Sequence, residues 1–386
     1  MARWHSATVL NVTPEKRQVW QFSANNDGFI LAREKNIPAA EPLPAKIISK
    51  DWHSLGKKKL NIAWINSEKV FLRVLQLPAS DFKEILSMVE LQLEKISPLP
   101  VAQIVWSIEI LPQKTDNLQT VIVIIAARHG VEEFLGQLET AGYLADRLEL
   151  PLLDQLLATP IQGDGVWIYP GETKSSPCLV AWWYGGVLRN ATLINGGERF
   201  QEQVAQIAWA GEVEGWLTAP PRFHLVATNE TATIWKPLLN QWTEQPVEII
   251  SALPAAKLAA LSAQRAGRAE LGGNLLPAEF TTRYHQQLVD RLWMGGLGAL
   301  VMIYLIGVII YFGALQVLKF QQYRVEKDVA NISNSYTNAM QLKERVRILE
   351  EQANLKYAAL DCWKAASDLL PQEMSLSRMT FQQGKT

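Results

Sequence analysis

The sequence predicts an N-terminal α/β domain of two lobes, followed by one membrane-spanning helix and a coiled-coil segment. Strand and helix patterns alternate through two halves of similar size, which is typical of a two-lobed α/β domain. Residues 292–318 then carry no charge, and beyond them apolar residues recur at spacings of three and four. Together these patterns predict a folded body attached to a membrane by a single span.

Composition excludes several classes of protein. The 386 residues include 37 Lys and Arg against 38 Asp and Glu, so a basic surface for nucleic acid is not expected. A hydrophobic content of 48% with 19% charged residues argues against a disordered chain. Cys178 and Cys362 are the only cysteines and belong to no Cys/His cluster, which argues against a disulfide framework and a structural zinc site.

The first lobe is predicted from short alternating segments separated by turn residues. Residues 60–65 and 70–75 are interpreted as a hairpin around Asn66, and Ser80 as the N-cap of a helix that ends near residue 96. The other expected strands are residues 7–10, 19–22, 29–33, 104–111 and 121–126, and the other expected helices are residues 130–140 and 151–158.

The second lobe is predicted to start near Gly165. Its expected strands are residues 166–169, 178–183, 187–193, 223–227 and 247–250, and its expected helices are residues 198–210 and 235–242. Residues 255–268 are rich in Ala, Lys, Gln and Arg, which favours a helix or a linker.

The uncharged run 292–318 is long enough to cross a bilayer. As a helix it would measure roughly 40 Å, against a hydrocarbon core of about 30 Å, so a buried core helix is the weaker alternative. Gly295 and Ala299 form one small-xxx-small pair, which predicts helix packing in the membrane unless the glycine is simply tolerated there. Charges flanking the run do not set its orientation; we expect the large N-terminal part to stay in the cytoplasm because no signal sequence precedes it.

Beyond the span, the apolar spacing predicts a coiled coil with one phase slip, in which a second copy of the chain is the expected partner. The seam residues are Val325, Val329, Ile332, Tyr336 and Ala339, followed by Leu342, Val346, Leu349 and Ala353. Residues 374–381 alternate like a strand, and since one strand cannot bury a face alone, residues 363–386 are expected to begin a further domain.

Several short motifs resemble known proteins. Residues 90–100 (ELQLEKISPLP) and 73–78 (RVLQLP) resemble PilM-like proteins of type IV pilus assembly, as do Ala126-Ala127-Arg128 and Ala141-Gly142-Tyr143. Asn274-Leu275-Leu276-Pro277 resembles the motif that opens PilN-like membrane proteins. Trp363, with the segments Leu369-Leu370-Pro371 and Met374-Ser375-Leu376, resembles the start of the PilN-type ferredoxin-like domain. The order of these motifs is similar to the plan of the L component of type II secretion systems (GspL-like).

This resemblance implies a domain for each part of the chain. It implies an actin-like (ribonuclease H-like) cytoplasmic domain over residues 1–262 and a juxtamembrane segment over 263–291. The transmembrane helix 292–318, a periplasmic coiled coil over 319–362 and the start of a truncated ferredoxin-like domain over 363–386 follow. A single-pass protein of the bacterial inner membrane is implied, with its N-terminus in the cytoplasm and its C-terminus in the periplasm.

The resemblance also implies a function. The chain would be a scaffold that binds the motor ATPase of the machine, other inner-membrane platform proteins and a second copy of itself, as a homodimer. Whether the machine secretes proteins or builds pili stays open. Asn274, Leu275, Leu276 and Pro277 are expected to dock in cis on the second lobe, the alternative being a plain juxtamembrane linker.

The nucleotide-binding motifs of actin-like proteins are degenerate here. The first hairpin, residues 7–14, has no Asp-x-Gly, and the second, residues 168–174, keeps Gly171 with the acid displaced. Residues 227–231 replace the glycine-rich adenosine loop, and no P-loop motif occurs. We therefore expect a non-enzymatic protein with no catalytic residue, cofactor or metal; a membrane-anchored ATPase of the actin superfamily is the alternative.

Two pairs of carboxylates are close in sequence, Asp146 with Glu149 and Glu132 with Glu133. Both pairs are interpreted as solvated helix faces rather than as acid–base catalysts.

Overall fold

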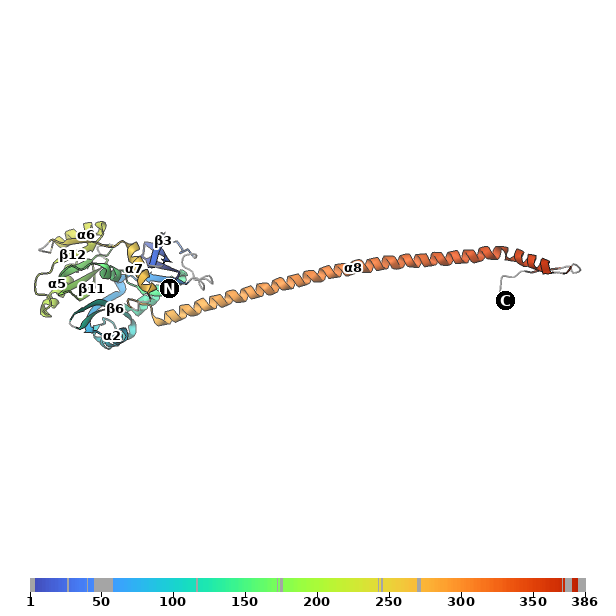
Figure 1. The fold of residues 1–386 in the computed structure, drawn as a ribbon. Coiled ribbons are helices and arrows are strands. Elements are labelled where there is room, and N and C mark those ends of the chain that lie inside the picture. The colour runs from blue at the N-terminus through green and yellow to red at the C-terminus, as the bar shows by residue number, and fades with distance from the viewer. Residues whose placement is uncertain are drawn as a thin grey trace. The chain divides into compact units, whose positions relative to one another are not determined.

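The computed structural model describes residues 4–25, 28–39, 41–44, 58–115, 117–171, 173, 176–241, 243, 246–268, 272–369, 371 and 377–380. The chain divides into two compact units, Met1–Met294 and Gly295–Thr386. The first unit contains three sheets and their helices, and the second consists mainly of the continuation of one long helix (Figure 1).

The first lobe is built on a five-stranded sheet with strand order β3-β2-β1-β4-β8. Its strands are β1 (Ser6–Val12), β2 (Lys16–Asn25), β3 (Gly28–Pro38), β4 (Lys59–Trp64) and β8 (Arg147–Glu149). The first three form an antiparallel meander, whereas β4 and β8 pair in parallel. Helices α3 (Arg128–Thr140) and α4 (Pro151–Ala158) lie on either side of β8 in the chain.

The second lobe repeats this plan with strand order β11-β10-β9-β12-β13. Its strands are β9 (Gly165–Tyr169), β10 (Pro177–Tyr184), β11 (Val187–Asn195), β12 (Phe223–Ala227) and β13 (Glu248–Ser251), with helices α5 (Phe200–Val213) and α6 (Asn229–Asn240). Again three antiparallel strands precede two parallel ones. Two copies of one mixed sheet are the arrangement of the two-lobed actin-like fold, so this part of the predicted fold class is confirmed.

A third sheet is inserted in the first lobe, with strand order β5-β7-β6. Its strands are β5 (Val70–Pro78), β6 (Ile104–Thr115) and β7 (Leu118–Ala127), and helix α2 (Phe82–Ile96) packs on it. The predicted hairpin of residues 60–65 and 70–75 is therefore wrong, because β4 and β5 belong to different sheets. A short 3-10 helix, Ser67–Lys69, separates the two strands, and Asn66 caps it. Asp81, not Ser80, is the N-cap of α2.

Helix α7 (Ala255–Gly267) follows the second lobe in the chain but packs on the sheet of the first. Its small buried residues Ala259, Ala263 and Ala266 allow the helix to lie close to Trp20 and Ile62. Residue 262, the expected end of the actin-like domain, falls inside α7, and the first compact unit continues to Met294.

The two lobes share one apolar core. Leu10 of β1, Trp167 of β9 and Leu179 of β10 belong to the same buried cluster and are each at most 1% exposed. Side chains from both large sheets therefore pack together in one buried cluster.

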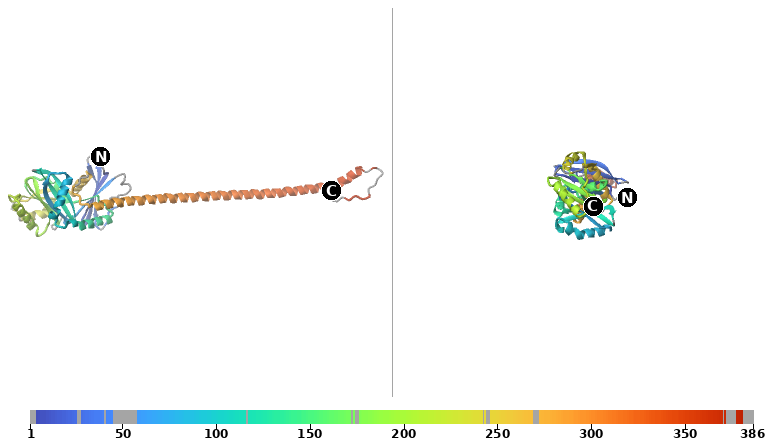
Figure 2. Two further views of the ribbon diagram at one scale, coloured as in Figure 1. Left: turned by 90° about the horizontal axis from the view of Figure 1, so that it is seen from below. Right: turned by 90° about the vertical axis from the view of Figure 1, so that its left-hand side faces the viewer.

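A single helix, α8, runs from Ala278 to Leu369 (Figure 2). From Leu292 it includes an 18-residue window of mean hydropathy 2.3 that is 0% buried, which is long and apolar enough to cross a membrane. Residues 363–369, where the ferredoxin-like domain was expected to begin, continue α8. Half of the predicted strand 374–381 lies outside the described residues, and its described half, residues 377–380, has no regular secondary structure.

Candidate interaction site at the edge of the first lobe

The Asn274–Pro277 motif adds a short extended segment to the open edge of the first sheet. Strand β8 pairs with β4 on one side, and on its other side Leu275 donates its backbone N–H to the Leu148 carbonyl at 2.8 Å. Two residues earlier, Gly273 donates its backbone N–H to the carbonyl of Ile108 in β6 at 3.0 Å. The segment thus connects the edge of the first sheet to the inserted sheet.

Asn274 completes this pairing with its side chain. Its Oδ1 accepts the backbone N–H of Leu148 at 3.0 Å and that of Leu276 at 3.1 Å. The side-chain amide oxygen therefore accepts hydrogen bonds that a backbone carbonyl would accept in a regular β-ladder. Two N–H groups that the docked segment would otherwise leave without a partner are satisfied by one residue.

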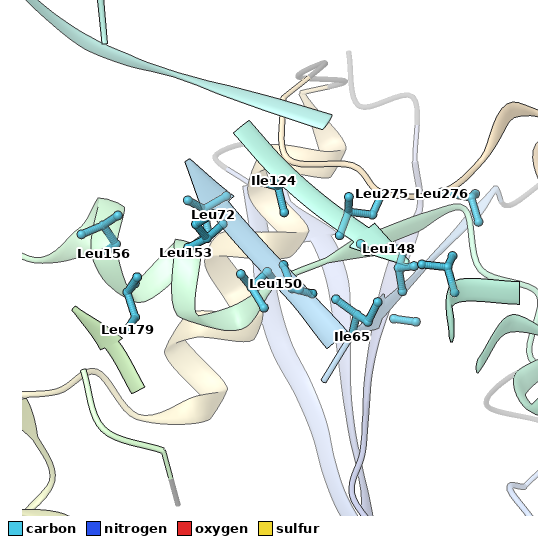
Figure 3. Packing of buried hydrophobic residues seen from close by; sticks show 14 of the residues in the cluster. Ile65, Leu72, Ile124, Leu148, Leu150, Leu153, Leu156, Leu179, Leu275 and Leu276 are labelled. Carbon is cyan, nitrogen blue, oxygen red and sulfur yellow. The ribbon is translucent and has the colours of Figure 1, made fainter. Parts of the chain in front are cut away.

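The two leucines of the motif enter the shared core. Leu275 is 0% exposed and Leu276 is 8% exposed, and Figure 3 shows both beside Leu148, with Ile65 and Ile124 in the same cluster. Full burial of a leucine side chain stabilises a fold by roughly 1.5–3 kcal/mol. The motif is consequently part of the domain core, and the alternative interpretation as a plain juxtamembrane linker is wrong.

The expectation that the motif docks on the second lobe is wrong. Its backbone partners are Leu148 of β8 and Ile108 of β6, both in the first lobe and its inserted sheet. Strand β8 was not predicted, because its three residues, Arg147–Glu149, carry two charges and resemble a loop. Without β8 the first sheet has no open edge at this position, so sequence reasoning could not locate the docking site.

A buried cluster of charges lies under the segment. Arg147 donates from Nε to Glu149 Oε1 at 2.6 Å and from Nη2 to the carbonyl of Gly272 at 2.7 Å. Glu149 is 0% exposed, so the interpretation of Asp146 and Glu149 as a solvated helix face is wrong. Asp146 instead accepts the backbone N–H of Asn61 through Oδ2 at 2.7 Å.

Arg265 of α7 joins the cluster from the other side. Its guanidinium lies 3.1 Å from Asp154 Oδ1, 3.7 Å from Glu149 Oε2 and 3.8 Å from Glu109 Oε2. Ser262 donates to Asp154, and Trp64 donates through Nε1 to Ser262 at 3.1 Å.

Burial dominates the electrostatics of this cluster. It raises the pKa of the Glu149 and Asp154 carboxyls above their ordinary values, and Arg265 opposes that rise at both. The arrangement holds α7, α4 and β8 together by paired charges, and its geometry is that of a structural network.

The first turns of α8 are fixed to α3 immediately after the motif. Arg283 Nη2 donates to Glu139 Oε1 at 2.9 Å, and Gln287 donates to the same oxygen. Arg128, at the start of α3, pairs with Glu279 at 3.1 Å. Tyr284, on the same turns of α8, is only 6% exposed.

The loops that correspond to phosphate-binding loops have structural roles in this fold. A Cβ on Gly171 would lie 2.4 Å from Ser176 Cβ and 2.8 Å from the carbonyl of Pro177, so tight packing of its own loop requires the glycine. Thr228 and Thr231 form a capping box for α6 and use the amides at that turn. Among the described residues, no group of three or more His, Cys, Asp or Glu side chains is placed to hold a metal ion.

Glu132 and Glu133 lie on the exposed side of α3, as predicted, where they pair with Arg128 and Lys69. Gly295 and Ala299 lie on an exposed part of α8, and a Cβ added to Gly295 would meet nothing within 4 Å. Helix packing at this pair stays a prediction.

No protein-family model and no curated protein sequence matches the chain. Similar solved structures include a PilM–PilN type IV pilus biogenesis complex, with 15% identity, a TM-score of 0.43 and coverage of 69% of this chain and 97% of that one. The cytoplasmic domain of EpsL, an inner-membrane component of the type II secretion system of Vibrio cholerae, has 9% identity, a TM-score of 0.39 and coverage of 71% and 99%.

A third similar structure is a Bacteroides thetaiotaomicron protein of unknown function with an actin-like ATPase fold. It has 14% identity, a TM-score of 0.40 and coverage of 67% of this chain and 96% of that one. At these identities and scores nothing about activity or partners follows from the likeness.

Proposed function

We propose that this chain is an inner-membrane scaffold of a type II secretion or type IV pilus machine. In this proposal the two-lobed domain faces the cytoplasm and binds the motor ATPase, while α8 crosses the membrane and contacts periplasmic and platform components. The type of machine comes from the resemblance of the sequence motifs to PilM-like and PilN-like proteins. The contacts of residues 272–287 supply the physical basis for a linking role.

The observation that carries the proposal is the way the membrane helix begins. Leu275 and Leu276 are buried in the domain core, and Tyr284 in the second turn of α8 is buried against the domain. Helix α8 therefore starts as part of the folded domain. From Tyr284 to the uncharged run at Leu292 the helix is unbroken and rises about 12 Å. The residues that lead into the uncharged run are therefore held by the folded domain.

Tethering also explains how weak contacts suffice for such a scaffold. A protein held at a membrane meets other membrane-bound partners at high effective concentration, so several individually weak contacts give a stable assembly. No single high-affinity site is then required on either lobe.

Binding of the motor tests the proposal directly. Full-length protein in lipid nanodiscs is mixed with the purified hexameric motor ATPase of a secretion or pilus system from the same source, and retention on an affinity resin is measured. Retention of the motor is the expected result, with empty nanodiscs as the control. Failure to retain either motor would contradict the scaffold role.

The same preparation separates the scaffold from an ATPase. A ligand present at a hundred times its dissociation constant adds about 2.7 kcal/mol to the stability of the protein that binds it. We expect no change in the unfolding temperature with magnesium ATP and no phosphate release. A clear rise in the unfolding temperature together with turnover would favour the alternative function, a membrane-anchored ATPase.

A further inference from the structure

The edge of the second sheet at β13 has no strand beside it among the described residues. Strand β13 pairs in parallel with β12 and ends the strand order of its sheet. Strand β8 has the matching place in the first sheet, where it pairs in parallel with β4 and ends that strand order. The two lobes thus have equivalent edges, and residues 273–276 add an extended segment to the edge at β8.

The direction of the backbone groups on β13 is set by its pairing with β12. Ala252, just after the strand, donates its N–H to the carbonyl of Ala227 in β12 at 3.1 Å. Alternate residues of a strand turn their N–H and C=O groups to opposite sides. Ile250 therefore bonds toward β12, whereas Ile249 and Ser251 turn both of their backbone groups toward the open edge.

Leu148 has the equivalent position on β8. Its N–H donates to Asn274 Oδ1 at 3.0 Å, and its C=O accepts the N–H of Leu275 at 2.8 Å. Within the part of the chain that the structure describes, the backbone groups of Ile249 and Ser251 have no such partners. A peptide segment on β13 would satisfy them as residues 273–276 satisfy those of Leu148.

Strand β3, the other outer strand of the first sheet, differs from β13 because it is protected against pairing. It carries the exposed charges Arg33, Glu34 and Lys35, and its register with β2 shifts once. Charges and bulges are devices that keep an edge strand from pairing with another chain. Strand β13 pairs with β12 without a register shift, and its one charged side chain, Glu248, lies 3.0 Å from Nδ1 of His224 on β12.

The side chains of the open edge indicate what it binds. Ile249 is 43% exposed and Ser251 is exposed, and neither carries a charge. The N–H of Val247, the preceding residue that turns outward, is already accepted by Asn240 Oδ1 at 3.4 Å. The open part of the edge is thus short and uncharged, which suits an extended segment with aliphatic side chains such as the one on β8.

We propose that the edge of β13 binds an extended, uncharged segment of a partner protein, with the chemistry of Asn274-Leu275-Leu276, by strand addition. The bound segment pairs with the backbone groups of Ile249 and Ser251 and packs an aliphatic side chain on Ile249. The chain's own motif is buried on β8, in this molecule and in any further copy, so the occupant of β13 belongs to another protein.

A peptide of residues 272–278, acetylated and amidated at its ends, tests the site on the full-length protein in lipid nanodiscs. Amide hydrogen exchange is measured with and without saturating peptide. We expect exchange at Ile249 and Ser251 to slow at least tenfold, while Ile250, which already bonds toward β12, changes little. Slower exchange at Leu148 instead would mean that the peptide replaces the docked segment on β8. That result, or no change at any of these amides, would overturn the site on β13.

A variant and a modified peptide separate strand addition from other contacts. Ile249→Lys should weaken peptide binding at least fivefold and keep the wild-type unfolding temperature, because the side chain is exposed. Leu91→Lys, at an exposed leucine on α2, is the matched control and should bind as the wild type does.

The same peptide with N-methyl groups on the amides of both leucines cannot donate these hydrogen bonds to β13, and it should bind at least tenfold more weakly. Equal binding of the methylated and unmethylated peptides would overturn strand addition, as would unchanged binding by Ile249→Lys. None of these measurements includes the motor ATPase, so their outcome is independent of the scaffold role.

Discussion

Asn274 replaces a backbone carbonyl at the edge of a β-sheet. Its Oδ1 accepts the N–H of Leu148 at 3.0 Å, while the N–H of Leu275 donates to the carbonyl of the same Leu148 at 2.8 Å. One residue of β8 is thereby paired through both of its backbone groups to the segment that leads into the membrane helix. The start of α8 is consequently held at the edge of this sheet, within the first compact unit.

Replacement of Asn274 by Ala should loosen this unit. The N–H groups of Leu148 and Leu276 would lose their acceptor, and a buried unsatisfied donor costs roughly 1–3 kcal/mol. We expect a lower unfolding temperature of the full-length protein and faster hydrogen exchange at Leu148. Asn195→Ala, at an exposed asparagine, is the matched control; if both variants lost the same stability, the role given to the Asn274 side chain would be wrong.

The leucines of the motif should determine whether the segment stays docked. Leu275→Asp with Leu276→Asp would place two charges in an apolar core, which costs more than the 2–5 kcal/mol typical of a buried Leu→Ala change. We expect trypsin to cleave at Arg268 and Arg283 at least tenfold faster than in the wild type, because the docked segment no longer protects these sites. Leu91→Asp, at a leucine 87% exposed on α2, should leave the cleavage rate unchanged.

Much of the fold can be predicted from the sequence because many of its elements depend on local patterns of apolar and turn residues. The meander of each lobe and helices such as α3 and α4 have clear periodicity and turn residues, and they form close to where the patterns predict them. The interpretation of Asn66 as a hairpin turn is wrong because only long-range pairing decides that β4 joins β1 while β5 joins β7.

The candidate site was only half predictable for the same reason. The Asn274–Pro277 motif is visible in the sequence, but its receptor, β8, is a three-residue strand with charged ends. Glu149 can be buried because the charges of Arg147 and Arg265 compensate its own. Arg265 belongs to α7, a helix more than a hundred residues later in the chain. No local pattern indicates such a partner.

Glu139 should control how tightly α8 is held to α3, with little effect on overall stability. It accepts from Arg283 at 2.9 Å and from Gln287, in a contact that is partly open to solvent. Partly exposed ion pairs contribute about 0.2–1 kcal/mol, so Glu139→Ala should leave the unfolding temperature nearly unchanged while hydrogen exchange over residues 278–290 accelerates severalfold. Glu133→Ala, which removes an ion pair with Lys69 on another side of α3, should not change exchange in that segment.

Arg265 should be the residue whose loss makes stability most dependent on pH. Its guanidinium lies 3.1 Å from Asp154 and 3.7 Å from Glu149, and it opposes the rise in the pKa of both carboxyls that burial causes. Arg265→Leu leaves the two carboxylates with less compensation, and removing one partner of a buried ion pair costs about 3–5 kcal/mol. We expect a loss of that order near neutral pH.

Acid should partly reverse this loss. The pKa of each carboxyl in the folded protein lies above its ordinary value and rises further without Arg265, so on acidification the folded state takes up protons before the unfolded chain does. The destabilisation by the two uncompensated carboxylates is present in full above their pKa in the folded protein. It decreases as the pH falls toward the ordinary pKa values of Asp and Glu. Thermal unfolding at about pH 7 and about pH 5.5 should therefore show a narrower gap between wild type and Arg265→Leu at the lower pH. Arg189→Leu, at an exposed arginine on β11, is the control and should unfold at nearly the wild-type temperature at both pH values. If the difference in unfolding temperature between wild type and Arg265→Leu became larger in acid, these carboxylates would not be what destabilises the variant.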